Sequence, residues 1–178
     1  MDAIRNPTFI DVEASGFGKG SYPIEVGFVQ YGVAAHCFLI QPEPEWQHWD
    51  PKAAAVHGLS RETLTKHGRS VRYVAAQLNE LLLEKTVYTD AWGHDTAWLA
   101  LLFHHADIAQ RFRLESLRCL LTEEHAVRWT AVKREVVRDL ALTRHRASTD
   151  ARILMETYRR VISDELLPVA PQAVGLPR

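Results

Sequence analysis

The chain has 178 residues, of which 47% are hydrophobic and 24% charged, and its net charge is −1; these values are typical of one soluble globular domain. The charge argues against a protein that simply coats nucleic acid, and no apolar run approaches the length of a membrane span. Cys37 and Cys119 lie too far apart to indicate a zinc site or a disulfide framework, so we expect buried thiols. Residues 1–5 carry no signal-peptide pattern, which favours a cytoplasmic location.

Acidic and basic side chains are distributed unevenly along the chain. Residues 1–50 hold seven acidic and two basic side chains, whereas residues 110–160 hold twelve basic and seven acidic ones. An acidic metal pocket beside a basic half of the molecule would suit a polyanionic substrate. The alternative is that most of the arginines lie on solvated helix faces of mixed charge.

The stretch 7–17 predicts an apolar strand that ends in two acids, Asp11 and Glu13. Side chains alternate between the two faces of a strand, so both carboxylates project to the same side. The β-prone residues around them indicate a buried strand, where a carboxylate pair is costly unless a metal or other cations neutralise it. The pair is therefore a candidate metal site, and the alternative is two solvated acids at a strand end.

The rest of the chain alternates between strand and helix patterns. Apolar runs over 24–29 and 34–40 predict two strands that form an antiparallel meander with the first. Helical spacing predicts an amphipathic helix over 70–85 with Ser70 as its cap. The other expected elements are short helices from 51 and 60, strands over 86–89 and 112–117, and helices from 90, over 122–140 and over 148–163. This order indicates one α/β domain with a mixed sheet over 1–167, followed by a flexible proline-containing tail over 168–178.

Asp95, His145 and Asp150 stand out once the first acidic pair is suspected. Asp95 lies near the start of the helix after strand 86–89, and His145 lies on a polar loop just ahead of the last helix. Asp150 lies in the first turn of that helix, which Ser148 or Thr149 is expected to cap. Taken singly, either aspartate could serve as a cap or compensate the helix dipole.

The order and spacing of these residues resemble the motifs of the DEDDh exonucleases, the DnaQ-like group of the ribonuclease H-like superfamily. The matching segments are Asp11-x-Glu13 in an Asp-x-Glu-x-Ser-Gly context, Asp95 followed by Thr-Ala-Trp-Leu, and His145-x-x-x-x-Asp150. The resemblance implies a ribonuclease H-like fold, in which a mixed five-stranded sheet has a meander of three strands plus parallel strands and is flanked by helices.

The resemblance also implies an activity, namely 3′-5′ exonuclease action at the 3′ end of single-stranded RNA or DNA with release of nucleoside 5′-monophosphates. Asp11, Glu13, Asp95 and Asp150 would then hold two Mg²⁺ or Mn²⁺ ions, which prefer carboxylate oxygens. Two ions about 3.5 to 4 Å apart can stabilise the attacking and leaving oxygens together. His145 would act as the general base, because imidazole titrates near neutral pH.

Four further residues become candidate substrate contacts through the same resemblance. Ser15 and Gly16 would offer backbone groups to the terminal nucleotide, Phe17 would stack on a base, and His57 would line the base pocket. The alternatives are that Phe17 anchors a mobile loop and that His57 is a turn residue before Gly58.

The chain also departs from the family pattern. Asp90 stands where many members have Asn, and His94 stands where a Phe is common; both bear on substrate preference, and Asp90 could instead cap the helix. A non-catalytic nucleic-acid-binding or scaffold module with the same fold is the alternative function. A homodimer is a candidate assembly, and Trp46 and Trp49 could serve its interface or cover the core.

Overall fold

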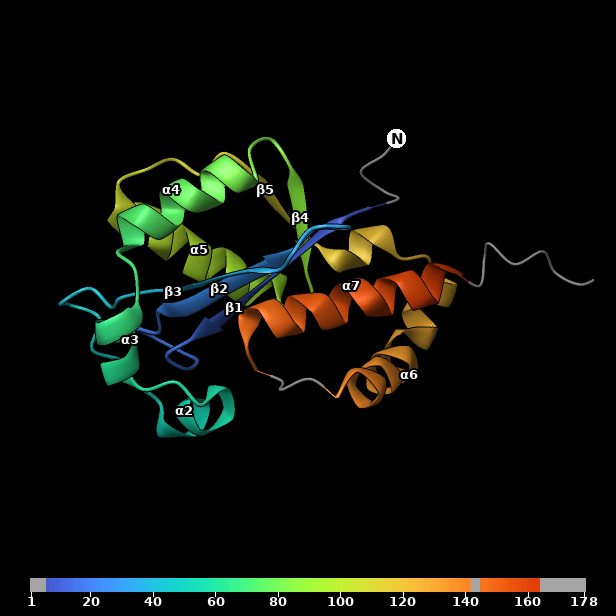
Figure 1. The fold of residues 1–178 in the computed structure, drawn as a ribbon, viewed down its shortest axis with the longest axis horizontal. Helices are drawn as coiled ribbons and strands as arrows, with labels where there is room; N and C mark the ends of the chain where they lie inside the picture. Colours follow the sequence, from blue (N-terminus) through green and yellow to red (C-terminus); the bar gives the residue numbers. More distant parts are fainter. Residues whose placement is uncertain (1–5, 142–144, 164–178) are drawn as a thin grey trace, which may run out of the picture.

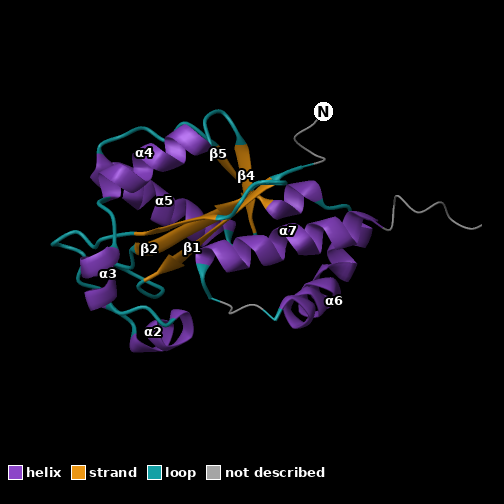
Figure 2. Ribbon diagram, viewed as in Figure 1, coloured by secondary structure: helices purple, strands orange, loops and turns teal. Residues whose placement is uncertain are grey.

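The computed structural model describes residues 6–141 and 145–163. Within these ranges a five-stranded mixed sheet has the order β3-β2-β1-β4-β5, with helices on both faces (Figure 1, Figure 2). The strands are β1 (Thr8–Ala14), β2 (Pro23–Val29), β3 (His36–Leu39), β4 (Thr86–Thr89) and β5 (Arg113–Ser116). The first three form the antiparallel meander, and β4 and β5 continue parallel to β1. The predicted α/β fold with a mixed sheet is confirmed.

Alternation along β1 divides the core into two clusters. Ile10 and Val12 belong to the cluster beneath α4 (Val71–Leu81) and α5 (Trp92–Ala106). Phe9 points to the opposite face, where its ring lies 5.6 Å from that of Tyr158 on α7 (Ala147–Ser163). The odd-numbered residues of β1, which include Asp11 and Glu13, therefore face the side of the sheet that α7 covers.

The predicted helices are present, with small shifts at their starts, and α4 ends at Leu81 instead of near residue 85. Ser70 caps α4 as predicted, and α6 (Glu123–Leu140) follows η1 (Leu117–Leu120). The two short helices are α2 (Pro51–His57) and α3 (Arg61–His67). Helix α5 begins at Trp92 without a side-chain cap, so the alternative that Asp90 caps it is wrong. Helix α7 begins at Ala147, one residue before Ser148, so the predicted caps Ser148 and Thr149 lie inside its first turn.

Two expectations about burial need correction. Both cysteines are exposed instead of buried. Trp46 is buried and its ring stacks on Tyr22 at 5.0 Å, while Trp49 is partly buried against the same core. These tryptophans therefore cover the core, and they offer no support for a homodimer interface.

No helix among the described residues is both long enough and apolar enough to span a membrane. The expected tail over 168–178 lies outside the described residues.

Candidate active site

Close contact between β2 and the start of α7 positions the candidate site. A Cβ atom added to Gly27 would lie 2.2 Å from the backbone nitrogen of Ser148, so no other residue fits there without moving the helix. Gly27 is paired with Asp11 across the β1–β2 ladder. The absence of a side chain on β2 thus lets the first turn of α7 lie against the sheet beside Asp11.

An ion pair between the buried Glu25 and the partly exposed Arg146 holds the same turn. The carboxylate of Glu25, which has no exposed surface, accepts hydrogen bonds from Arg146 Nη2 at 2.6 Å and from Arg146 Nε at 3.0 Å. It also accepts a bond of 2.8 Å from the backbone N–H of Ala147, the first residue of α7. Arg146 follows His145 directly in the chain. The pair therefore fixes the backbone at the start of α7, and with it the positions of His145 and Asp150.

Asp150, in the first turn of α7, and His145, just ahead of that helix, lie beside Glu13 of the acidic pair of β1. One ligand atom each from Glu13, His145 and Asp150 lie within 4.8 Å of one another. Asp11 is close enough that the charges of Asp95, Glu13 and Asp150 add to the effect of burial, and together they raise its pKa well above the usual value. Burial, followed by the charges of Asp150 and Glu25, raises the pKa of Glu13 to about 7.

Asp95 lies in the first turn of α5, close enough for the charge of Glu13 to act on it, but it is not one of the three residues whose ligand atoms lie within 4.8 Å of one another. Its side chain is fully buried and its Oδ2 accepts a hydrogen bond from the hydroxyl of Thr89, at the end of β4. Its Oδ1 is buried and has no hydrogen-bond partner among the described residues. Burial is the main cause that raises the pKa of Asp95 to about 7, and the charges of Asp90 and Glu13 contribute. A buried oxygen without a donor and mutually repelling carboxylates fit a place for divalent cations.

His145 has a backbone φ of +64°, the left-handed region that non-glycine residues rarely adopt. Its N–H donates to Asp150 Oδ2 at 2.9 Å, which holds this conformation. The strain costs of order 1 to 3 kcal/mol and is typical of residues at functional sites. The predicted placement of the histidine just ahead of the last helix is confirmed.

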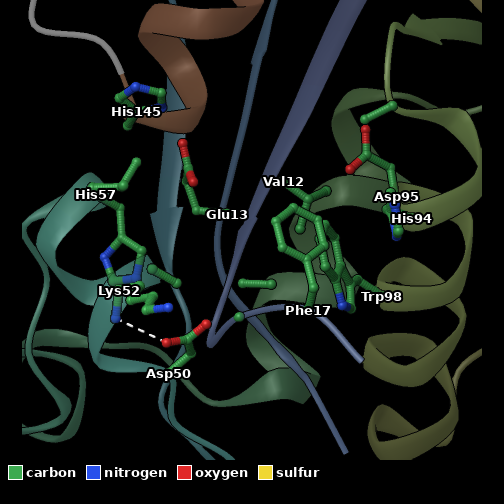
Figure 3. A pocket seen from close by; sticks show the side chains of 15 residues that line it. Val12, Glu13, Phe17, Asp50, Lys52, His57, His94, Asp95, Trp98 and His145 are labelled. Carbon is green, nitrogen blue, oxygen red and sulfur yellow. Dashed lines mark hydrogen bonds between the residues drawn. The ribbon is translucent and has the colours of Figure 1, made fainter. Parts of the chain in front are cut away.

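A pocket of about 500 Å³ opens beside the cluster. Glu13, Asp95 and His145 line it together with Phe17 and His57 (Figure 3). The figure shows Glu13 and His145 near each other at one end, and Phe17 and His57 on two sides of the hollow. The pocket therefore joins the acidic cluster to the residues that were predicted to contact substrate.

Phe17 belongs to a set of three neighbouring rings on one wall. It is 67% exposed, and its ring lies 5.0 Å from that of His94 and 5.9 Å from that of Trp98. The His94 and Trp98 rings stack at 5.5 Å, so the residue that departs from the family pattern still contributes a flat ring. An exposed ring supported by two others is a suitable surface for base stacking.

His57 is buried and presents one defined donor. Its Nδ1 accepts the N–H of Leu59 at 3.1 Å, so the ring proton of the neutral imidazole is on Nε2. Burial lowers the pKa of His57, which favours this neutral form. Nε2 is buried without a partner among the described residues, and His57 lines the pocket. A buried N–H donor without a partner is uncommon, and this one belongs to a ring that lines the pocket.

The backbone groups of Ser15 are already paired within the protein. Its N–H donates to Tyr22 O at 2.9 Å, and its carbonyl accepts the N–H of Asp50 at 2.8 Å. Gly16 lines the pocket with φ of +139°, and a Cβ atom there would lie 2.6 Å from the Cβ of Asp50. The substrate contacts expected of Ser15 and Gly16 stay predictions, and Gly16 is the better placed of the two.

Comparison with solved structures bears on the fold. The chain is similar to E. coli exonuclease I in complex with a dA16 oligonucleotide, with a TM-score of 0.65 and 12% sequence identity over 90% of this chain and 42% of that one. It matches the zinc-bound form of the E. coli exonuclease I complex with single-stranded DNA equally well, again with a TM-score of 0.65, 12% identity and 90% and 42% coverage. The fold is the ribonuclease H-like fold of these exonucleases. The chain spans about two fifths of the length of the exonuclease I chains that it matches.

No family model matches the sequence, and no curated protein does either. The comparisons therefore establish the fold, while the roles of individual residues rest on the geometry.

Sequence reasoning missed two ion pairs that shape the site. Glu25 pairs with Arg146, and Asp90 pairs with Lys133 of α6 at 2.5 Å. Glu25 could have been noticed as the one acid within the apolar strand 23–29. Its partner lies 121 positions away, and no local pattern indicates which of the many arginines it is.

Proposed function

We propose that this protein is a two-metal-dependent 3′-5′ exonuclease that hydrolyses single-stranded RNA or DNA and releases nucleoside 5′-monophosphates. The observation that supports the proposal is the cluster of Glu13, His145 and Asp150 beside a pocket that Asp95 also lines, with Asp11 near enough to be affected by their charges, in a fold shared with exonuclease I. The matched structures that contain oligonucleotides agree with such a substrate.

Asp11, Glu13, Asp95 and Asp150 would hold two Mg²⁺ or Mn²⁺ ions. The residues fit these ions because all four offer hard oxygen ligands, and because Asp95 Oδ1 is buried without a donor. Positive charge would also relieve the repulsion that raises the pKa values of Asp11 and Glu13. When bound, such ions supply charge stabilisation for the attacking and leaving oxygens.

The remaining chemistry belongs to the side chains of the pocket. An imidazole nitrogen of His145, beside the carboxylates, accepts the proton that the attacking water loses. Phe17 supports the terminal base by stacking, which tolerates any base, and His57 Nε2–H donates a hydrogen bond to the terminal nucleotide. The ring of His94 extends the stacking surface behind Phe17.

The direct test is digestion of 5′-end-labelled single-stranded RNA and DNA of the same sequence with Mg²⁺ or Mn²⁺. The proposal predicts a ladder shortened from the 3′ end, loss of all products in EDTA, and no cleavage of a circular single strand. Asp11→Ala is expected to be inactive, and His145→Ala is expected to lose most of the rate while calorimetry still detects Mn²⁺ binding. Full metal affinity in the wild type with no hydrolysis of any oligonucleotide would overturn the proposal in favour of the non-catalytic module.

A further inference from the structure

Two adjoining hollows lie between α6 and the turn from β4 to α5. Their volumes are about 390 and 220 Å³, and Asp90, Trp129 and Thr130 line both. Asp90 lies close enough to the acidic cluster that its charge raises the pKa values of Asp11 and Asp95. Ala91, the next residue, lines the large pocket of the site instead. The two hollows, called the α6 groove below, therefore begin where the acidic cluster ends.

The α6 groove is lined by more basic than acidic side chains. Lys133 and Arg134 line the larger hollow and Arg118 lines the smaller one, whereas Asp90 is the single acid among the described residues that line either. Lys133 neutralises Asp90 through their ion pair. Arg118 and Arg134 are both exposed to solvent, so their positive charge dominates the groove. This charge is complementary to a phosphodiester backbone.

Trp129 supplies the flat apolar surface of the α6 groove. It packs against the core cluster that contains Leu117 and Leu154, and it is only partly buried. The indole is therefore held in place from behind while it still lines both hollows. A fixed indole between cations is a typical platform for a nucleotide base, since every base presents a π face.

We propose that the α6 groove binds the nucleotides on the 5′ side of the bond that is cleaved, with Trp129 stacking on a base and Arg118 and Arg134 binding phosphates. The proposal rests on the proposed function, because it requires the 3′ end to occupy the pocket of Phe17 and His57. A strand whose scissile phosphate reaches the acidic cluster then continues past Asp90 into the groove. With the groove as part of the binding site, the preferred substrates are strands longer than one or two nucleotides.

The test compares a ten-nucleotide single strand with the p-nitrophenyl ester of thymidine 5′-monophosphate, which has no 5′ neighbour to fill the groove. For the double variant Arg118→Ala/Arg134→Ala, KM for the ten-mer is expected to rise about tenfold or more, since two exposed cations that face the phosphates are removed. KM and kcat for the ester are expected to stay within about twofold of the wild type. Trp129→Leu is expected to raise KM for the ten-mer alone.

The matched control is Arg111→Ala/Arg113→Ala. Arg113 is paired with Thr86, at the end of the β4–β5 ladder away from Asp90, and both arginines are exposed. This variant removes the same charge elsewhere and is expected to leave both KM values unchanged. Equal losses in the two double variants would show a general charge effect and overturn the assignment, as would an unchanged KM for the ten-mer in Arg118→Ala/Arg134→Ala.

Binding separates failure of the groove from failure of the proposed function. Fluorescence anisotropy of a labelled ten-mer in EDTA needs no hydrolysis, and the slope of log Kd against log salt is expected to fall by about 1.4 in Arg118→Ala/Arg134→Ala, because each phosphate contact with a single strand contributes about 0.7. That result supports the groove even if the wild type cleaves nothing. If poly-glutamate binds the wild type through these arginines while the ten-mer does not, the groove belongs to an acidic protein partner and the assignment is wrong.

Discussion

Glu25 and the acids of β1 lie side by side on the same face of the sheet, but their charges are compensated differently. Glu25 of β2 is fully buried and has Arg146 and the N–H of Ala147 as partners. Glu13, its direct neighbour across the ladder, belongs instead to a cluster of acids in which burial and mutual repulsion raise the pKa values. One arginine neutralises the structural acid, and the acids of the cluster share no comparable cation among the described residues.

The difference separates structure from function. A buried carboxylate that only supports the fold is paired, because an uncompensated buried charge is costly. A cluster of carboxylates that repel one another lowers the stability of the metal-free protein, and such a cost is typical of a site built for a ligand of opposite charge. Substitutions in the two places should therefore change the free energy of unfolding in opposite directions.

The largest effect is expected for Asp11→Asn. The variant keeps the shape of the side chain but removes a charge from the cluster, so it should lower hydrolysis of a single-stranded oligonucleotide about a thousandfold or more, in line with several kcal/mol of metal-dependent stabilisation. Urea unfolding in EDTA at pH 8 should give a higher free energy of unfolding than for the wild type, because the repulsion is reduced. A variant that loses stability here would mean that Asp11 is a structural acid like Glu25.

Glu25→Gln is expected to have the next largest effect, and its main effect should be on the free energy of unfolding. It leaves the Arg146 guanidinium without its carboxylate, which should lower the free energy of unfolding by about 2 to 3 kcal/mol, less than the roughly 3 to 5 kcal/mol of a fully buried pair because Arg146 is partly exposed. Activity should fall through the shifted start of α7, and Mn²⁺ affinity should weaken with it.

Asp139→Asn is the matched control for that variant. It breaks the surface pair of Asp139 with Arg160, so its effect on unfolding should be clearly smaller. Equal destabilisation by the two substitutions would contradict the structural role given to Glu25.

The smallest expected effect is the pH dependence of the metal-free protein. Glu13 has a folded pKa of about 7 against an ordinary 4.5, so the folded state binds its proton more tightly than the unfolded state. The contribution of Glu13 to stability is therefore greatest at low pH and is lost as pH rises from about 5 through about 7. We expect about 1 to 2 kcal/mol between pH 5 and 8, since water partly screens Glu13.

Urea unfolding of the wild type and Glu13→Gln in EDTA at several pH values measures this contribution together with the effect of the Glu13 charge on the pKa values of Asp11 and Asp95. His57 titrates with the opposite sign, because burial lowers its pKa, and it affects both proteins equally. The difference between the two curves should grow with pH in favour of Glu13→Gln. Parallel curves would show that Glu13 is solvated like an ordinary surface acid.

The sequence by itself determined the elements and the identity of the candidate residues. Alternation in β1 predicted that Asp11 and Glu13 share a face, and the helical period with its cap predicted α4. Both follow from short-range geometry, with periods of two and about 3.6 residues that are readable without any contact between distant segments. The spacing of His145 and Asp150 around a helix start is local in the same sense.

Only the tertiary structure decided which partners meet and which remain unpaired. Glu25 and Arg146 are 121 positions apart, Asp90 pairs with α6 instead of capping its own helix, and Trp46 turned out to be buried. Burial and pairing depend on how the layers pack, and in this chain many arginines could have reached each acid with equal plausibility. The sequence therefore named the carboxylates, but the folded structure distinguished the acid that an arginine neutralises from those that repel one another.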